Sequence, residues 1–289
     1  MLNMSELMGL LRSAHSMALM QLRNYLVGSA VLDPSSGTIV SLTSYGPRLA
    51  YVHLAIESIA RGSSRPSRLI LWLEEDASRL SLSASIRRLQ RRGLEVRFVQ
   101  DVGSHKKYWP LVVDDEFSGQ AVVLADDDVV YPTYWLTRLE REYARGRADV
   151  IAHRAVEIAF ASSGKPLPYA MWKHAGAADV SARVLPTGVG GVLYSPAALD
   201  AVRRAGAGFK EVAPRADDLW LHFCVVSAGF CPLQIEDTLR RDFVDVRGTG
   251  SQTLTMANVG GGGNDAVFAE LLMWGSYRDA LRQGCHAAD

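Results

Sequence analysis

An apolar run that ends in three carboxylates constrains this chain more than any other feature. Ala121–Ala125 contains two valines and no polar residue, and Asp126, Asp127 and Asp128 follow it directly. An apolar run without alternation is typical of a central strand that is covered on both faces. Three carboxylates at its end repel one another unless they are hydrated, protonated or bridged by a divalent cation. The run therefore predicts a buried strand that ends in either a solvated acidic turn or a Mg²⁺ or Mn²⁺ site.

Strand and helix patterns alternate through the first half of the chain. Strands are expected at residues 38–43, 68–73, 94–99, 121–125 and 149–153. Helices are expected at residues 48–60, 83–92 and 133–145, with a shorter helical piece ending near 117. This alternation predicts an α/β fold with a Rossmann-like, mostly parallel central sheet flanked by helices. Ligands bind such sheets at the carboxyl ends of the strands, where the Asp triplet is expected to lie.

Composition excludes some classes of protein. The 289 residues suffice for one large domain, and 31 basic residues balance 31 acidic ones. The balance gives no electrostatic reason to expect a nucleic-acid partner. No run of apolar residues is long enough to span a membrane. The three cysteines, Cys224, Cys231 and Cys285, are odd in number and lack zinc-site spacing, which favours a cytoplasmic location.

Residues 1–32 are expected to form an N-terminal helical extension. Leucines, methionines and alanines recur at nearly helical spacing over residues 1–27, interrupted by Glu6, Arg12 and Arg23. Such a helix can pack on its own domain, contact another subunit or lie on the inner face of a membrane. We favour packing, because the polar face is not strongly basic, as the polar face of a lipid-surface helix tends to be.

The pattern changes after Arg154. Residues 161–183 are rich in loop formers, and residues 187–194 are expected to be a Gly-rich strand. Gly190 and Gly191 would let its backbone approach either a neighbouring helix or a sugar closely. Further helices are expected at 196–204, at about 215–228 and at 264–272, and a short strand at 233–236. Asp217 and Asp218 open the second of these helices.

Three groups of charged residues could form one site. The Asp triplet offers metal ligands, Lys106 and Lys107 offer cations for phosphates, and Asp217 or Asp218 offers a general base. Together they would let a metal and lysines neutralise a leaving diphosphate while a carboxylate deprotonates an incoming hydroxyl. Each group also has a plainer interpretation. A lysine pair is commonly solvated, and an acidic pair at a helix start is stabilised by the helix dipole alone.

The ordered set of these segments resembles the nucleotide-sugar-dependent glycosyltransferases of the GT-A type. The Asp triplet after its strand is similar to the DxD motif of that family. The strand at 39–45, Lys106-Lys107-Tyr108, and the segments 187–191 and 214–220 match in the same order. The likeness extends over about residues 38–228 and is strongest to bacterial enzymes that build surface polysaccharides or lipopolysaccharide. A DxD motif alone is common, whereas the ordered set is more specific.

The resemblance implies an enzyme, a metal-dependent hexosyltransferase that acts on a nucleotide-sugar donor, most often a UDP-sugar. Asp128 and Asp126 would bind the Mn²⁺ or Mg²⁺ ion, and Asp126 and Asp127 would contact the donor. Further donor-binding residues would be Thr43, Ser44 and Tyr45 near the nucleotide, and Lys106 and Lys107 near the phosphates. Residues 33–289 would form one GT-A-like domain, with a nucleotide-binding half at 33–155 and an acceptor-side half at 156–289.

The same resemblance assigns the acceptor side. Asp218, ahead of Asp217, would deprotonate a hydroxyl of a glycan or glycolipid, with inversion at the sugar. Gly190, Gly191 and Trp220 would lie beside the acceptor. The chain has no membrane-embedded half and no QxxRW-like segment, so processive synthesis is not expected. A retaining glycosyltransferase, a sugar nucleotidyltransferase and an inactive glycan-binding module stay as alternatives.

Overall fold

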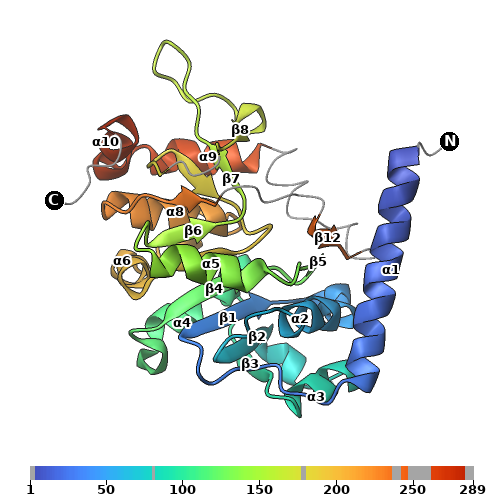
Figure 1. The fold of residues 1–289 in the computed structure, drawn as a ribbon. Coiled ribbons are helices and arrows are strands. Elements are labelled where there is room, and N and C mark those ends of the chain that lie inside the picture. The colour runs from blue at the N-terminus through green and yellow to red at the C-terminus, as the bar shows by residue number, and fades with distance from the viewer. Residues whose placement is uncertain (1–3, 80–81, 177–179, 236–241, 247–261, 284–289) are drawn as a thin grey trace.

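A seven-stranded central sheet organises the chain in the computed structural model (Figure 1). The structure describes residues 4–79, 82–176, 180–235, 242–246 and 262–283. The strand order is β11-β6-β10-β4-β1-β2-β3. These strands are β1 Thr38–Thr43, β2 Arg68–Glu74, β3 Glu95–Val99, β4 Ala121–Ala125, β6 Val150–Ala152, β10 Val192–Tyr194 and β11 Leu233–Gln234.

The sheet is mostly parallel, as the sequence predicted. β1 lies between β2 and β4 and pairs with both in parallel, so that Val40 faces Leu69 on one side and Val123 on the other. β2 pairs with β3 in parallel, and β6 pairs with β11 in parallel. β10 is the exception, because it inserts antiparallel between β4 and β6 and places Leu193 between Val123 and Ile151.

Alternate residues of β4 enter two different cores, one on each face of the sheet. Val123 and Ala125 join the core under α2 Val52–Ala60, α3 Ala84–Gln90 and α5 Trp135–Ala144. Val122 and Leu124 join the core on the opposite face. The helices of that face are α4 Trp109–Val113, α6 Pro196–Ala205, α7 Phe209–Val212, α8 Asp217–Ser227, α9 Gly263–Leu271 and α10 Gly275–Gln283. Covering both faces explains why β4 is apolar at every position.

Shorter elements decorate this frame. β5 Val129–Val130 pairs antiparallel with β12 Val244–Asp245. β7 Ala155–Glu157 pairs antiparallel with both β8 Lys173–His174 and β9 Val184–Pro186. Single 3₁₀ turns lie at η1 Gly46–Ala50, η2 Glu75–Arg79, η3 Gly103–Lys107, η4 Asp115–Phe117 and η5 Tyr169–Met171. The strands β5, β7, β8, β9 and β12, of two or three residues each, are too short to show a periodic pattern in the sequence.

The expected N-terminal helix is present as α1 Met4–Leu26. One of its faces packs on the domain, where Met20 is buried against Leu54 of α2 and Val130 of β5. Asn24 donates to the Glu57 carboxylate at 3.0 Å, and Glu57 in turn pairs with Arg92. The packing that the sequence favoured is therefore confirmed for this face. Among the residues described, no helix is long and apolar enough to cross a membrane.

Two expectations about the second half need correction. The strand expected over residues 187–194 begins only at Val192. Gly190 and Gly191 adopt φ angles of 107° and 88°, which turn the chain and end regular pairing. The structure also contains α7 and α10, which the sequence did not predict. The argument from cysteines weakens as well, because Cys224 is buried and free whereas Cys231 is disulfide-bonded.

Candidate active site

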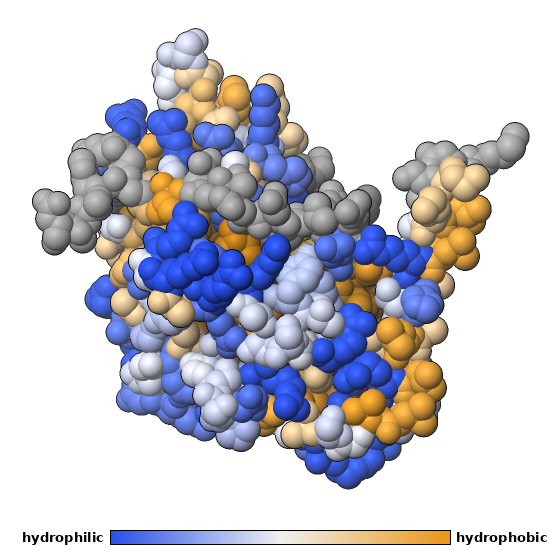
Figure 2. Space-filling view, viewed as in Figure 1, coloured by the Kyte–Doolittle hydropathy of each residue, from blue (hydrophilic) through white to orange (hydrophobic). Residues whose placement is uncertain are grey.

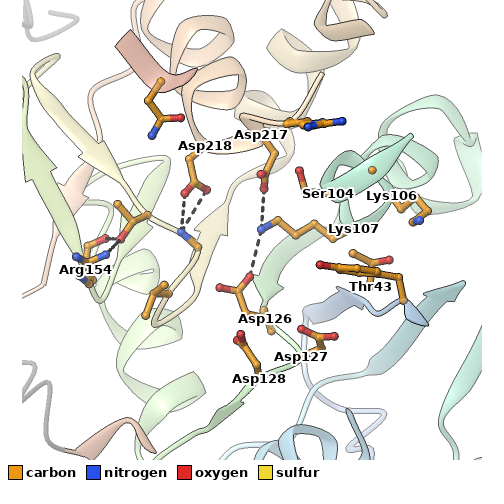
Figure 3. A pocket seen from close by; sticks show the side chains of 18 of the residues that line it. Thr43, Ser104, Lys106, Lys107, Asp126, Asp127, Asp128, Arg154, Asp217 and Asp218 are labelled. Atoms are coloured by element: carbon orange, nitrogen blue, oxygen red, sulfur yellow. Dashed lines mark hydrogen bonds and ion pairs between the residues drawn. The ribbon is translucent and has the colours of Figure 1, made fainter. Parts of the chain in front are cut away.

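A cavity of about 660 Å³ lies at the carboxyl ends of β1, β2 and β4. Its size is that of an ordinary small-ligand pocket. All three predicted groups of charged residues reach it. The described residues that line it include Thr43, Tyr45, Arg48, Glu74, Asp101, Lys106, Lys107, Asp126, Asp127, Asp128, Arg154, Tyr169, Trp172, His174, Thr187, Gly188, Arg215, Asp217, Asp218 and Asn264. Figure 3 shows Asp217 and Asp218 on one side, the Asp triplet on the other and Lys107 between them.

Asp127, the middle residue of the triplet, is held by the protein itself. Its side chain is buried, accepts a hydrogen bond from Ser44 Oγ at 2.5 Å and pairs with Arg48 at 2.7 Å. Burial raises the pKa of Asp127 above its ordinary value, although Arg48 and Ser44 oppose this effect. These bonds fix the loop that follows β4 and leave the neighbouring carboxylates nearer to the open space.

Asp126 and Asp128 are partly exposed, with 23% and 25% of their side chains accessible. Asp128 pairs with Arg48 at 2.8 Å. Burial and then the nearby Asp126 charge raise the pKa of Asp128 to about 6. Arg48 was missed in the sequence, where it follows an ordinary Gly46-Pro47 turn. Nothing in that local pattern indicates a partner some eighty positions away along the chain.

Lys107 connects the two acidic sides of the cavity. Its ammonium lies 2.7 Å from Asp217 Oδ2 and 3.3 Å from Asp126 Oδ1 (Figure 3). Burial opposes the charge, but Asp217, Asp126 and Asp218 outweigh it and hold the pKa of Lys107 well above its ordinary value. The Lys107 carbonyl accepts a 2.5 Å hydrogen bond from Ser41 of β1, which anchors this segment on the sheet.

The two carboxyls at the start of α8, Asp217 and Asp218, have pKa values shifted in opposite directions. Burial alone would raise the pKa of Asp217, but the adjacent Lys107 charge lowers it to about 2. Asp218 instead accepts the Gly188 N–H at 3.1 and 3.2 Å through its two oxygens. Burial and the Asp217 charge raise the pKa of Asp218 to about 7. A carboxylate that changes protonation near neutral pH is suited to act as a general base.

The residues expected near the nucleotide do not all line the cavity. Thr43 lines it and donates to the Trp72 carbonyl at 2.9 Å, and Tyr45 lies under the Arg48 guanidinium. Ser44 is buried against Asp127 and is not among the described lining residues. Lys106 points away from Lys107 and pairs with Glu74 at 2.8 Å and Asp101 at 2.5 Å.

The three residues expected beside the acceptor pack elsewhere, outside the described cavity wall. A Cβ atom on Gly191 would lie 2.6 Å from the Trp135 ring, and one on Gly190 would lie 3.3 Å from His153. Both glycines allow close packing, and neither is among the residues that line the cavity. Trp220 is 3% exposed and packs in the core.

Another wall of the cavity comes from a segment that the sequence marked only as loop-rich. Tyr169, Trp172 and His174 line it, together with Arg154, whose guanidinium donates to Thr187 Oγ1 at 2.9 Å. Aromatic side chains beside a polar cavity suit the flat faces of sugar rings. The sequence signal that was available is the presence of Tyr169 and Trp172 within a Pro-rich loop.

The donor set suits a divalent cation that is shared with a ligand. In the described part of the chain no three His, Cys, Asp or Glu side chains are grouped so that they could hold a metal ion by themselves. Asp126 and Asp128 are the partly exposed carboxylates of the triplet, and they pair with Lys107 at 3.3 Å and with Arg48 at 2.8 Å. Mg²⁺ and Mn²⁺ commonly use one or two carboxylates together with substrate phosphates. After burial, the Asp126 charge is the next cause of the raised pKa of Asp128, and a cation between the two carboxylates would relieve that repulsion.

Comparison with known proteins bears on the fold. No family model and no curated protein matches the sequence. A mannosyltransferase from Pyrobaculum calidifontis, solved with GDP-Man and Mn²⁺, aligns with a TM-score of 0.50 at 12% identity, over 96% of this chain and 82% of that one. GalNAc-T7, solved with UDP, GalNAc and Mn²⁺, aligns with a TM-score of 0.51 at 10% identity, over 84% of this chain and 49% of that one.

A third solved structure, residues 1–349 of S. aureus TarS, aligns with a TM-score of 0.46 at 15% identity, over 68% of this chain and 60% of that one. The matched part of this chain thus spans less than two thirds of TarS and of GalNAc-T7. The fold is an α/β fold with its cavity at the strand ends. More particularly, it is the GT-A glycosyltransferase fold that the sequence resemblance implied.

Proposed function

We propose that this chain is a metal-dependent glycosyltransferase that moves a sugar from a nucleoside diphosphate to a hydroxyl of a glycan or glycolipid. The observation that carries the proposal is the shared cavity, where Asp218, with a pKa of about 7, faces Asp126 and Asp128 across Lys107. The GT-A fold, seen elsewhere in structures that hold GDP-Man or UDP with Mn²⁺, supports it. A UDP-sugar donor and a role in bacterial polysaccharide or lipopolysaccharide synthesis belong to the same proposal.

In the proposed reaction the acceptor oxygen forms a bond to the anomeric carbon while the bond from that carbon to the diphosphate breaks. The electron pair leaves with the nucleoside diphosphate, and the hydroxyl proton passes to an Oδ atom of Asp218. A divalent cation held by Asp126 and Asp128 would neutralise the charge of the leaving diphosphate. Lys107 adds a fixed positive charge in a poorly solvated place, where such charges act strongly.

Lys107 also determines which acid accepts the proton. Its ammonium keeps Asp217 ionised, and the resulting negative charge favours protonation of Asp218. Asp218 is thereby the carboxylate that can take up a proton near neutral pH and hand it to solvent afterwards. A base beside the acceptor, acting in line with the departing diphosphate, produces inversion at the sugar.

The deciding experiment is a donor screen that measures nucleotide release from UDP-, GDP- and CDP-sugars with Mn²⁺, and again with EDTA. We expect one donor class to be turned over, EDTA to abolish the release and Mn²⁺ to restore it. Asp128→Asn should lose the metal-dependent turnover and keep the cooperative unfolding transition of the wild type. Asp200→Asn, an exposed site on α6, is the matched control.

Several outcomes would count against the proposal. Near-normal turnover by Asp128→Asn removes the metal role, and nucleotide release without any metal does the same. Retention of the anomeric configuration in the product removes the base role of Asp218. If calorimetry finds no metal-dependent binding of any nucleotide sugar, a glycan-binding module becomes the better account.

A further inference from the structure

Helix α1 carries a second apolar face, which points away from the domain. More than half of the large hydrophobic side chains that the structure describes as exposed belong to this one helix. Met4, Met8, Leu11, Leu22, Tyr25 and Leu26 are each between 53% and 73% exposed. Figure 1 shows α1 upright at one edge of the molecule, and Figure 2 shows hydrophobic side chains along that edge. Packing on the domain therefore accounts for only half of the apolar character of α1.

The two faces of α1 differ in the contacts that they make. The inner face is fixed by Met20 and by polar anchors, since Ser13 donates to the Asp245 carbonyl at 2.9 Å and Asn24 donates to Glu57 at 3.0 Å. The outer face makes no such contacts within the described part of the chain. At 23 residues α1 is roughly 35 Å long. Its outer face thus offers a long apolar strip at the edge of the domain.

Arginines from a neighbouring helix flank one end of this strip. Arg88 of α3 lies over the Tyr25 ring at 4.1 Å and donates to the Asn24 backbone carbonyl at 3.0 Å. Arg87 and Arg91 are exposed on the same side of α3, because residues three or four apart share a helix face. Neither α3 nor the described outer side chains of α1 include an acidic residue. α3 thus adds basic charge beside the strip to the two arginines, Arg12 and Arg23, that α1 itself contains.

We propose that the outer face of α1, together with Arg87, Arg88 and Arg91, docks this protein on a membrane surface that contains anionic lipid. An apolar helix face with an aromatic residue and flanking basic groups matches the interface between headgroups and acyl chains. Each arginine held near an anionic surface contributes about fivefold to binding. Lipid chains also accommodate a wide apolar face. The exposed side chains of Leu7, Leu19 and Leu26 make the strip on α1 wide.

A second copy of the chain is the less favoured occupant. A two-helix coiled coil uses a narrow seam, flanked by charged positions that select the partner. Here the described outer face of α1 offers no acidic group to meet the arginines of a partner. Anionic phosphate headgroups provide that complement directly.

The test is sedimentation of the full chain with vesicles, which needs no donor and is therefore independent of the proposed transfer reaction. Vesicles of phosphatidylcholine alone are compared with vesicles that contain about 30% phosphatidylglycerol. We expect wild type to bind the anionic vesicles at least tenfold more strongly, with binding that weakens as salt is added. The double variant Leu11→Glu/Leu22→Glu should lose at least tenfold in binding.

Arg87→Gln/Arg91→Gln should lose about 25-fold in binding to the anionic vesicles and little of the weak binding to phosphatidylcholine. Val113→Glu, which changes a 52% exposed valine on another helix, is the control and should bind like wild type. Absence of wild-type binding, or equal binding by Leu11→Glu/Leu22→Glu, overturns the proposal. A dimer in solution that Leu11→Glu/Leu22→Glu dissociates, without vesicle binding, assigns the face to a second copy instead.

Discussion

At the scale of single residues, Lys107 separates the chemistry of two adjacent carboxylates. Asp217 meets the ammonium at 2.7 Å, whereas Asp218 turns to the Gly188 N–H. Burial acts on both carboxyls, but the Lys107 charge lowers the pKa of Asp217 to about 2, whereas burial and then the Asp217 charge raise the pKa of Asp218 to about 7. One acid thus stays ionised and the other can exchange a proton. The pair that looked like a simple helix start in the sequence has two unequal members.

This division predicts the pH dependence of turnover. In the proposed reaction only deprotonated Asp218 accepts the proton of the acceptor hydroxyl, so the wild-type rate should rise as the pH increases through about 7. Asp218→Asn should reduce kcat by about 10²- to 10⁴-fold and remove this limb of the profile. Initial rates between about pH 5 and 9 provide the measurement. An unchanged limb in Asp218→Asn would assign the base to another residue, and Asp200→Asn controls for the substitution itself.

Site residues in contiguous motifs could be predicted from the sequence, whereas residues that depend on a partner far away in the sequence could not. The Asp triplet was visible because a strand and its end are contiguous. Lys107 and Asp218 were found as separate motifs, and the parallel-sheet rule supplied a reason for them to meet. Arg48 was not found, because its role depends on pairing with Asp127 and Asp128 across the fold. An ion pair between residues so far apart in the chain produces no periodic pattern in the sequence.

At the scale of elements, the turn before β10 is shaped by close packing. The sequence predicted a strand there, since glycine and valine alternate. This alternation does not reveal that Gly190 and Gly191 adopt positive φ angles. Gly191 has a φ of 88° and abuts the Trp135 ring of α5, while Trp135 Nε1 donates to the Gly190 carbonyl at 2.5 Å. The turn also carries the Gly188 N–H that Asp218 accepts. Packing at α5 and geometry at the site are therefore coupled.

Gly191→Ala should consequently be strongly destabilising. The new Cβ would meet the Trp135 ring at 2.6 Å, in addition to the strain of a positive φ. We expect a loss of about 2–4 kcal/mol in the free energy of unfolding, measured by urea denaturation. Gly119→Ala is the matched control, because Gly119 also has a positive φ but has open space around its Cβ position. It should lose only about 1 kcal/mol. Equal losses in both variants would show that packing against Trp135 is unimportant.

At the scale of the whole molecule, the raised pKa of Asp218 lowers the stability of the folded state near neutral pH. Asp218 has a folded pKa of about 7, above the value of about 4 expected for an unfolded chain. The folded state therefore holds this proton more tightly, and the stabilisation is complete below pH about 4 and lost as pH rises towards 7. Asp217 acts in the opposite direction, and its contribution is lost only as pH falls towards about 2.

Asp218→Asn should separate this contribution from the rest of the titration. Asparagine carries no charge at any pH, so the Tm of the variant relative to wild type should increase between about pH 5 and 7.5. Thermal unfolding without ligand is the measurement. Asp200→Asn should shift Tm by the same small amount throughout the range. A constant difference for Asp218→Asn as well would mean that Asp218 titrates normally.

The overall architecture was largely predictable, and its exceptions have a common cause. The parallel strands β1 to β4 and their helices follow from long periodic segments, and the N-terminal helix follows from its spacing. The short strands β5, β7, β8, β9 and β12 were missed, because each exists only through a partner distant in sequence. That Tyr169, Trp172 and His174 line the cavity was missed for the same reason.

The antiparallel insertion of β10 has a consequence for the order in which the protein is made. β4 and β6 are finished early, but the strand that joins them is β10, some forty residues later than β6. A nascent chain shorter than about residue 194 thus leaves the edge of β4 open in the middle of the future sheet. Open edges recruit other strands. Ribosome-bound chains that stop before β10 should therefore need chaperone protection, and those that extend past it should not.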